Sequence, residues 1–317
     1  MLLSAEFVKS TAIELGFSAC GVCRAAEVDN SSFEEMQRYV SEGRNADMHY
    51  LERNLDLRRD PRLLTEGTKS IVSVALNYYP RQKMESSQYT LSYYAYGKDY
   101  HDVVKKRLEI LLERISEHFA TAGERVGGRA FCDTAPVLER YWAWQAGIGF
   151  IGKNTLLTIP HKGSFFFLGE LFLDCEFDFY DEPLRNKCGA CTRCIDACPA
   201  GALYEPFRLD ARRCLSYLTI ENRNELPEGT AAKMQECIYG CDRCQNVCPH
   251  NSFASATSVE EFTPSEKLLN MKRDGWHSLT QEQYSELFKG SAVKRAKYSG
   301  LMRNIAAAEQ NNDKEEQ

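Results

Sequence analysis

Hydrophobic and polar positions along the first 175 residues predict a mixture of helices and strands. The run 70–78 (SIVSVALNY) predicts a buried strand, and the apolar run 164–174, which contains Glu170, predicts another. The clearest helix is expected over residues 102–122, with Gly123 placed to end it. Its apolar stripe recurs every three or four positions and consists of Val104, Leu108, Leu111, Leu112, Ile115 and Phe119.

Shorter signals place further helices. Residues 5–15 predict a helix that ends near Gly16, and Ser32 with Glu35 forms a capping box that would open another helix. Pro136 suits the first turn of a helix that would run to about residue 145. The chain after residue 248 is polar and helical in pattern and ends in a polar tail.

Cysteine is the feature of composition that changes this picture. The chain has 13 cysteines, nine of them between Cys188 and Cys248, while Cys20, Cys23, Cys132 and Cys175 lie outside and are expected to be structural. A disulfide framework is typical of short secreted domains, whereas this chain of 317 residues begins without a signal-peptide pattern. It also lacks an apolar run long enough to cross a membrane. We therefore expect a cytoplasmic protein with reduced, metal-binding cysteines.

The first cysteine run has the spacing of a bacterial ferredoxin. Cys188-x2-Cys191-x2-Cys194-x3-Cys198 is followed directly by proline. In such a run three thiolates wrap one four-iron cluster and the fourth ligates the second cluster. A zinc site is the competing interpretation, but this spacing of four cysteines, with a proline directly after the fourth, is typical of iron–sulfur proteins and not of zinc sites.

The second run is less regular. Cys241-x2-Cys244-x3-Cys248 is also followed by proline, but the position where a first cysteine belongs is Ile238. The crossed arrangement predicts that one cluster is bound by Cys188, Cys191, Cys194 and Cys248. The other would be bound by Cys198, Cys241, Cys244 and either Cys214 or Cys237. We favour Cys214, because stretching a C-x2-C turn by one residue re-aims the sulfur; Cys237 would then be a small buried hydrophobe.

Three stretches upstream of the clusters resemble one family. They are Tyr94-Ala-Tyr96-Gly-Lys-Asp99-Tyr-His101, Asp133-Thr-Ala-Pro136-Val-Leu-Glu139-Arg140 and Gly149-Phe-Ile-Gly152-Lys153-Asn154. Together with the double-cluster run they resemble the epoxyqueuosine reductases, from about residue 45 to the C-terminal helices. The resemblance implies that the protein reduces epoxyqueuosine to queuosine at the wobble position of tRNA, with cobalamin and two 4Fe-4S clusters as cofactors.

The same resemblance assigns residues. Asp133 matches the proposed general acid of the family; it follows a predicted strand end, and burial there would raise its pKa and keep it protonated. Without the resemblance, Asp133 would more simply be a helix cap. Tyr96, Arg140, Lys153 and Asn154 are candidates for contact with cobalamin or the substrate base, although each could equally be an ordinary surface or capping residue.

The resemblance also implies partners. These are tRNA that carries epoxyqueuosine in its anticodon loop and an external donor of the flavodoxin or ferredoxin type, and we expect a monomer with no membrane contact. The net charge of −6 indicates no general affinity for nucleic acid. Residues 287–308 nevertheless hold a basic group without an acidic residue, which suits either phosphate contact or a solvated helix face: Lys289, Lys294, Arg295, Lys297 and Arg303.

We therefore predict an α+β fold. Residues 1–177 would form a nitroreductase-like, cobalamin-binding domain, residues 178–252 a ferredoxin-like two-cluster domain, and residues 253–317 C-terminal helices with a polar tail. Two other functions fit the clusters: a cobalamin-dependent reductive dehalogenase, and an electron carrier without a substrate.

Overall fold

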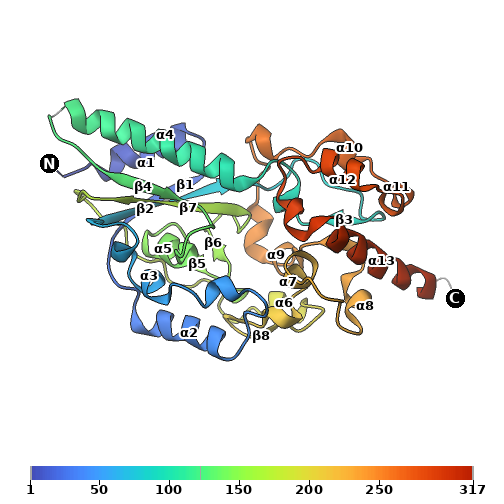
Figure 1. The fold of residues 1–317 in the computed structure, drawn as a ribbon. Coiled ribbons are helices and arrows are strands. Elements are labelled where there is room, and N and C mark those ends of the chain that lie inside the picture. Colours follow the sequence, from blue (N-terminus) through green and yellow to red (C-terminus); the bar gives the residue numbers. More distant parts are fainter. Residues whose placement is uncertain (1, 122, 316–317) are drawn as a thin grey trace.

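A four-stranded antiparallel sheet organises the first part of the chain (Figure 1). The computed structural model describes residues 2–121 and 123–315. The central strands β2 and β7 pair along their whole length, from Ser70 opposite Leu173 to Asn77 opposite Phe166. The strands lie in the order β1 (Ala19–Arg24), β2 (Ser70–Asn77), β7 (Phe166–Leu173) and β4 (Gly128–Phe131).

Helices cover both faces of this sheet, so its central strands are buried on both sides. On one face lie α1 (Ala5–Glu14) and α4 (Tyr100–Thr121), and on the other lie α2 (Asn30–Ser41), α3 (Leu55–Arg59) and α5 (Glu139–Gln145). Gly169 allows α4 to pack closely, because a Cβ there would meet Val104 at 2.7 Å. A Cβ on Gly21 would overlap the Ala146 carbonyl oxygen just after α5.

The rest of the chain forms a second layer of short elements beside the sheet (Figure 1). The small pair β5 with β6 lies between α5 and β7, the pair β8 with β9 lies within the cysteine segment, and β10 pairs in parallel with β3. Their bounds are β3 (Thr90–Leu91), β5 (Phe150–Ile151), β6 (Leu157–Thr158), β8 (Leu203–Glu205), β9 (Arg208–Leu209) and β10 (Cys237–Tyr239). The helices are α6 (Arg193–Asp196), α7 (Leu215–Ile220), α8 (Thr230–Met234), α9 (Arg243–Asn246), α10 (Glu266–Leu269), α11 (Arg273–His277), α12 (Gln281–Leu287) and α13 (Lys297–Glu315).

One early segment packs with the C-terminal helices. Tyr89, Leu91 and Tyr96 share a hydrophobic core with Trp276 and Leu301. Most of residues 84–96 are therefore held by this second core, while Tyr93 and Tyr94 pack against both this core and the one beneath α4. The division into 1–177, 178–252 and 253–317 stays a prediction, and the packing of this segment crosses it.

Most predicted elements are present, with three differences. The capping-box prediction is wrong: α2 begins earlier, because the Asp29 side chain accepts the Ser32 N–H at 2.9 Å and is the N-cap. Pro136 lies outside the first turn of α5, whose N-cap is Leu138. The expected polar tail continues α13 as far as Glu315; residues 316 and 317, like residue 122 at the end of the predicted long helix, lie outside the described residues.

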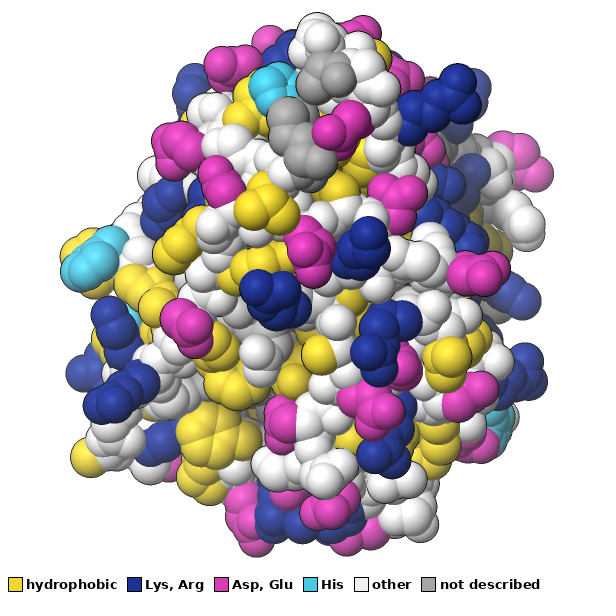
Figure 2. All heavy atoms as spheres, turned by 90° about the vertical axis from the view of Figure 1, so that its left-hand side faces the viewer, with side chains coloured by type: hydrophobic (Ala, Val, Ile, Leu, Met, Phe, Trp, Pro, Cys, Tyr) yellow, Lys and Arg dark blue, Asp and Glu magenta, His cyan; other side chains and the backbone are white. Residues whose placement is uncertain are grey.

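None of the described helices has the length and apolar character needed to cross a bilayer. On the side of the molecule that holds the start of the chain, basic, acidic and hydrophobic side chains are interspersed (Figure 2). That face does not gather charge of one sign, so it gives no sign of a surface that attracts nucleic acid.

Candidate functional site

A cavity of about 1640 Å³ lies where the sheet unit meets the cysteine segment. It is lined by residues of α2 and α5, the stretch from Tyr94 to His101, the loop after β4 and the segment from Tyr204 to Glu221. Pockets for ordinary small ligands measure roughly 300–1,000 Å³, so this cavity accommodates a larger molecule.

Asp133 projects into this cavity from the loop between β4 and α5. Its φ of 57° is in the left-handed region, which Asp adopts more readily than most residues but which still needs support. The Tyr100 hydroxyl donates to its Oδ2 at 2.5 Å, and His101 Nε2 lies 3.1 Å from the same oxygen. Its backbone N–H donates to Glu139 Oε1. The side chain is 56% exposed, and that exposed surface faces the cavity.

The neighbours of Asp133 favour its charged form. Burial alone would raise its pKa, but the hydrogen bonds from His101 and Tyr100 outweigh burial and lower it. The expectation of a raised pKa for Asp133 is therefore wrong, because the sequence does not show that these two donors meet the carboxylate. Burial opposes charge on His101 too, yet its hydrogen bonds to Asp133 and to Asp99 Oδ1, 2.6 Å from Nδ1, raise its pKa to about 9.

Behind Asp133 lie two carboxyl groups that the sequence analysis did not assign. Burial, followed by the charge of Asp133, raises the pKa of Glu139 to about 8. Burial, followed by the charge of Glu139, raises the pKa of Glu170 well above its ordinary value, and its side chain is completely inaccessible to solvent. The sequence feature that could have indicated this pair is Glu170, an acidic residue in the middle of an apolar strand.

Of the four candidates for cofactor contact, only one lines the large cavity. Arg140 lines the cavity and donates to the Thr155 carbonyl at 2.5 Å. Lys153 lies beside the cavity and donates to the carbonyls of Gly189 (2.7 Å) and Cys191 (2.9 Å), which steadies the first cysteine turn. Asn154 is buried and caps a turn by accepting the Leu156 N–H. Neither Lys153 nor Asn154 lines the cavity.

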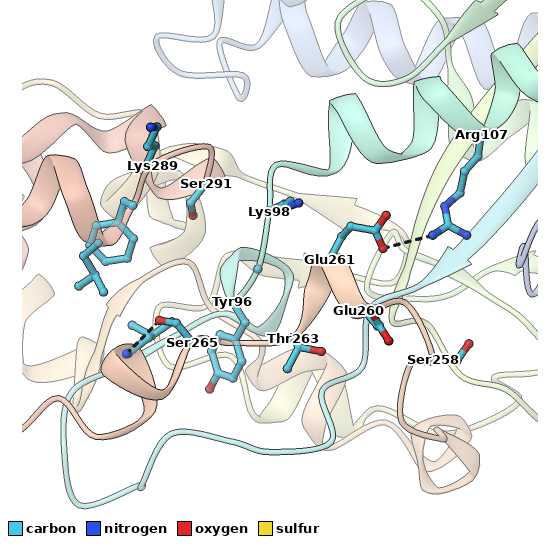
Figure 3. Close-up of a pocket in the computed structure, with 14 residues that line it drawn as sticks. Tyr96, Lys98, Arg107, Ser258, Glu260, Glu261, Thr263, Ser265, Lys289 and Ser291 are labelled. Carbon is cyan, nitrogen blue, oxygen red and sulfur yellow. Dashed lines mark hydrogen bonds and ion pairs between the residues drawn. The ribbon is translucent and has the colours of Figure 1, made fainter.

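Tyr96 lies at a separate, smaller pocket of about 710 Å³ (Figure 3). Its hydroxyl accepts the Met84 N–H at 3.2 Å, and the side chain is buried. Lys98, Lys289, Arg107 and Glu261 also line this pocket, and Arg107 points toward Glu261 and pairs with it. Its only described wall in common with the large cavity is Ser291.

The cysteines between 188 and 248 fall into two neighbouring groups. After burial, the charges of Cys188 and Cys248 raise the pKa of Cys194, and the charges of Cys188 and Cys191 raise that of Cys248. In the same way, Cys198 acts on Cys214, Cys214 acts on Cys241, and Cys241 and Cys214 act on Cys244. Within the described residues no three such side chains are close enough to hold a single metal ion. Each cysteine around a four-iron cluster binds a different iron, so its ligands stand further apart.

Cys214 and Cys237 differ in what surrounds them. Cys214 lines the large cavity and lies within electrostatic range of Cys198. Cys237 belongs to β10, and its thiol donates to the backbone carbonyls of Tyr239 (3.5 Å) and Gly240 (3.2 Å). Cys237 is also within electrostatic range of Cys241, so both cysteines lie near the second group, but of the two only Cys214 lines the cavity.

The basic residues between 287 and 308 do not form one face. Arg295 pairs with Glu221 at 2.7 Å, and Arg303 donates to backbone carbonyls that include Leu218 at 2.9 Å. Lys294 lines the large cavity, whereas Lys289 lines the smaller pocket. These residues therefore do not form one phosphate-binding patch: Lys294 and Arg295 lie at the large cavity, and Lys289 lies at the smaller pocket.

Two family models match the sequence. "Epoxyqueuosine reductase QueG, DUF1730" matches residues 58–134, and "4Fe-4S double cluster binding domain" matches residues 187–251. The epoxyqueuosine reductase of Leadbetterella byssophila is 47% identical over 299 residues, which cover 94% of this chain and 96% of that protein.

Solved structures agree with these matches. A crystal structure of epoxyqueuosine reductase with an epoxyqueuosine-modified tRNA-Tyr stem loop superposes with a TM-score of 0.86 at 29% identity, covering 96% of this chain and 80% of that chain. Another, from Bacillus subtilis, has its aspartate-bearing catalytic loop swung out of the active site. Its TM-score is 0.85 at 29% identity, covering 96% of this chain and 81% of that chain.

Proposed function

The chain belongs to the epoxyqueuosine reductase family, and we propose that its large cavity is where cobalamin and the modified base meet. It reduces epoxyqueuosine to queuosine at the wobble position of tRNA with cobalamin and two 4Fe-4S clusters, which sets aside the dehalogenase and the simple electron carrier. The observation that carries the proposal is that Asp133, with its own proton-donating neighbours, and Cys214 line one cavity.

The balance of the reaction defines what the residues must do. Converting an epoxide to an alkene takes up two electrons and two protons and releases the oxygen as water. Bound cobalamin supplies a cobalt centre able to pass electrons to the epoxide carbon. The cavity volume fits such a cofactor, and Arg140, on its wall, is the candidate that we retain for direct contact with it.

Two sets of cysteines would bring in the electrons. We assign Cys188, Cys191, Cys194 and Cys248 to the first cluster, and Cys198, Cys214, Cys241 and Cys244 to the second. The charges that act within each set support this division, and the action of Cys194 on Cys244 shows that the two sets are neighbours. Because Cys214 lines the cavity, the second cluster would be the one that faces the cobalamin, and the first would receive electrons from outside.

Asp133 would hand a proton to the departing oxygen. Its lowered pKa means that it rests as a carboxylate, so it has to receive a proton before it can donate one. His101 is placed to supply it: Nε2 lies 3.1 Å from Oδ2, and Asp99 holds the opposite ring nitrogen. We therefore assign His101 as the proton source and Asp133 as the group that delivers the proton.

The remaining assignments are coarser. A sheet covered on both faces by helices is compatible with a nitroreductase-like unit that binds the corrinoid. We propose a cytoplasmic monomer that receives electrons from a flavodoxin- or ferredoxin-type protein. Of the basic residues between 287 and 308, Lys294 and Arg295 line the large cavity, and we propose Lys294 as a contact for tRNA phosphate because Arg295 is paired with Glu221.

Replacing Asp133 with asparagine tests this function. Asn also tolerates the left-handed backbone, so the loop should keep its shape while the titrating group is lost. We expect turnover of epoxyqueuosine-tRNA to fall by roughly 10²- to 10⁴-fold, with iron and cobalamin contents unchanged. Asp102→Asn, an exposed change in the first turn of α4, is the matched control. A normal rate in Asp133→Asn would remove Asp133 from the mechanism.

A further inference from the structure

We propose that Glu139, which is half-buried and lines the cavity, pairs with the buried carboxyl group of Glu170 and so latches the Asp133 loop into the cavity. The inference rests on the proposed role of Asp133 and adds two positioning residues to it. Neither carboxyl group is needed to touch the substrate; the pair acts through the backbone of the loop.

Glu170 provides the fixed end of the latch. It lies in the middle of β7, opposite Ser73 of β2 on one side and Phe131 of β4 on the other. Ser73 Oγ donates to its Oε1 at 3.2 Å. The other carboxyl oxygen, Oε2, is buried, and no N–H or O–H group of a described residue donates to it. Phe172, two residues further along, packs with Trp142 of α5, so Glu170 faces the side of the sheet where α5 lies.

Glu139 provides the other end. It occupies the first turn of α5, and its carboxyl group lies within hydrogen-bonding and electrostatic range of Glu170. Two carboxylates cannot both carry charge at such a place, so the pair retains a proton. An O–H shared between the two groups gives Glu170 Oε2 the partner that it otherwise lacks. The charged groups that act on Glu139 are Asp133, His101 and Arg140.

The pair reaches Asp133 through its backbone. Glu139 Oε1 accepts the Asp133 N–H at the residue whose φ is 57°. This contact supports an uncommon backbone conformation at the point where the chain leaves β4 for α5. It also keeps the carboxylate of Asp133 within reach of His101 and Tyr100, which hold only the side chain. Loss of the backbone contact would leave the loop free to move out with its side chain.

Hydrogen–deuterium exchange on the full-length protein with both cofactors measures the latch directly. In Glu139→Ala we expect the Asp133 amide to exchange roughly tenfold to hundredfold faster, because it loses its acceptor. In Glu139→Gln, which keeps an acceptor oxygen, exchange should stay within about threefold of the wild type. The kcat for epoxyqueuosine-tRNA should fall in Glu139→Ala with KM unchanged, and Glu139→Gln should restore most of it.

Glu6→Ala is the matched control, because it also removes a first-turn carboxylate, from the exposed side of α1, and should change neither readout. Unchanged exchange in Glu139→Ala would overturn the latch, even if Asp133→Asn is inactive. Faster exchange in Glu139→Ala together with a fully active Asp133→Asn would keep the latch and overturn the proposed function.

A second variant, Glu170→Leu, tests the pairing if Glu139→Ala does not fold. Glu170→Leu keeps Glu139 and removes only the group that orients it. We expect faster exchange at the Asp133 amide in this variant as well, and exchange at the wild-type rate would overturn the pairing.

Discussion

The cysteine segment and the wall around Asp133 line the same cavity, yet they are assembled over different distances along the chain. Four of the eight assigned cysteines come from the stretch 188–198 and three more from the stretch 241–248, so that Cys214 alone stands apart. Around Asp133, by contrast, the interacting side chains come from α4, the loop after β4, α5 and β7.

This difference decides how far each region can be understood from single residues. Spacing largely defines the geometry of a cysteine turn, so its ligands can be proposed without a fold. Around Asp133, the charge of each acidic side chain depends on partners far away in sequence. The pKa of Asp133 is lowered, while that of Glu139 is raised. The two acidic residues are six positions apart, and their environments separate their roles.

The sharpest test of the comparison is the one cysteine that spacing alone left open. Cys214→Ala should reduce the iron content from about eight to about four per chain and abolish turnover, because the second cluster loses a ligand. Cys237→Ala is the matched control and should retain about eight irons, since its thiol already bonds to backbone carbonyls. Iron and acid-labile sulfide analysis measures both. Loss of iron in Cys237→Ala alone would reverse the assignment.

A smaller effect is expected from His101. His101→Gln removes the proton source and should lower kcat by roughly 10- to 100-fold. The pKa of His101 is raised to about 9, so wild-type turnover should decline as the pH rises through that value and His101 loses its proton. The variant should lose this high-pH decline. His118→Gln, at the other end of α4, is the control. A variant with the wild-type pH profile would contradict the assignment.

The smallest effect concerns stability. A native pKa of Glu170 raised well above 4.5 means that the folded protein keeps a proton that the unfolded chain has lost. The free energy of unfolding therefore falls as the pH rises above 4.5. Glu170→Gln should make this decline shallower by up to about 1.4 kcal/mol per pH unit. Anaerobic urea unfolding at several pH values measures it, with the exposed Glu176→Gln as control. Parallel pH dependences would indicate that Glu170 is ionised in the native state.

The sequence by itself determined the local features of this protein. The periodicity of the long helix is confirmed by α4, and the apolar runs are confirmed by β2 and β7. The cysteine spacing and the stretches around Asp99 and Asp133 were sufficient to indicate the family. These features can be predicted from the sequence because they depend on residues close together in the chain. This holds for the periodicity of helices and strands and for the turns of a cluster-binding loop.

Only the tertiary structure decided which of those residues meet and which charge they carry. It brings Cys214 to the cavity and turns Cys237 toward the backbone, and it moves Lys153 from the candidate cofactor contacts to the first cysteine turn. It also pairs Glu139 with a residue in a distant strand. The physical reason is that burial, hydrogen-bond partners and neighbouring charges set a pKa, and packing supplies all three from segments far apart in sequence.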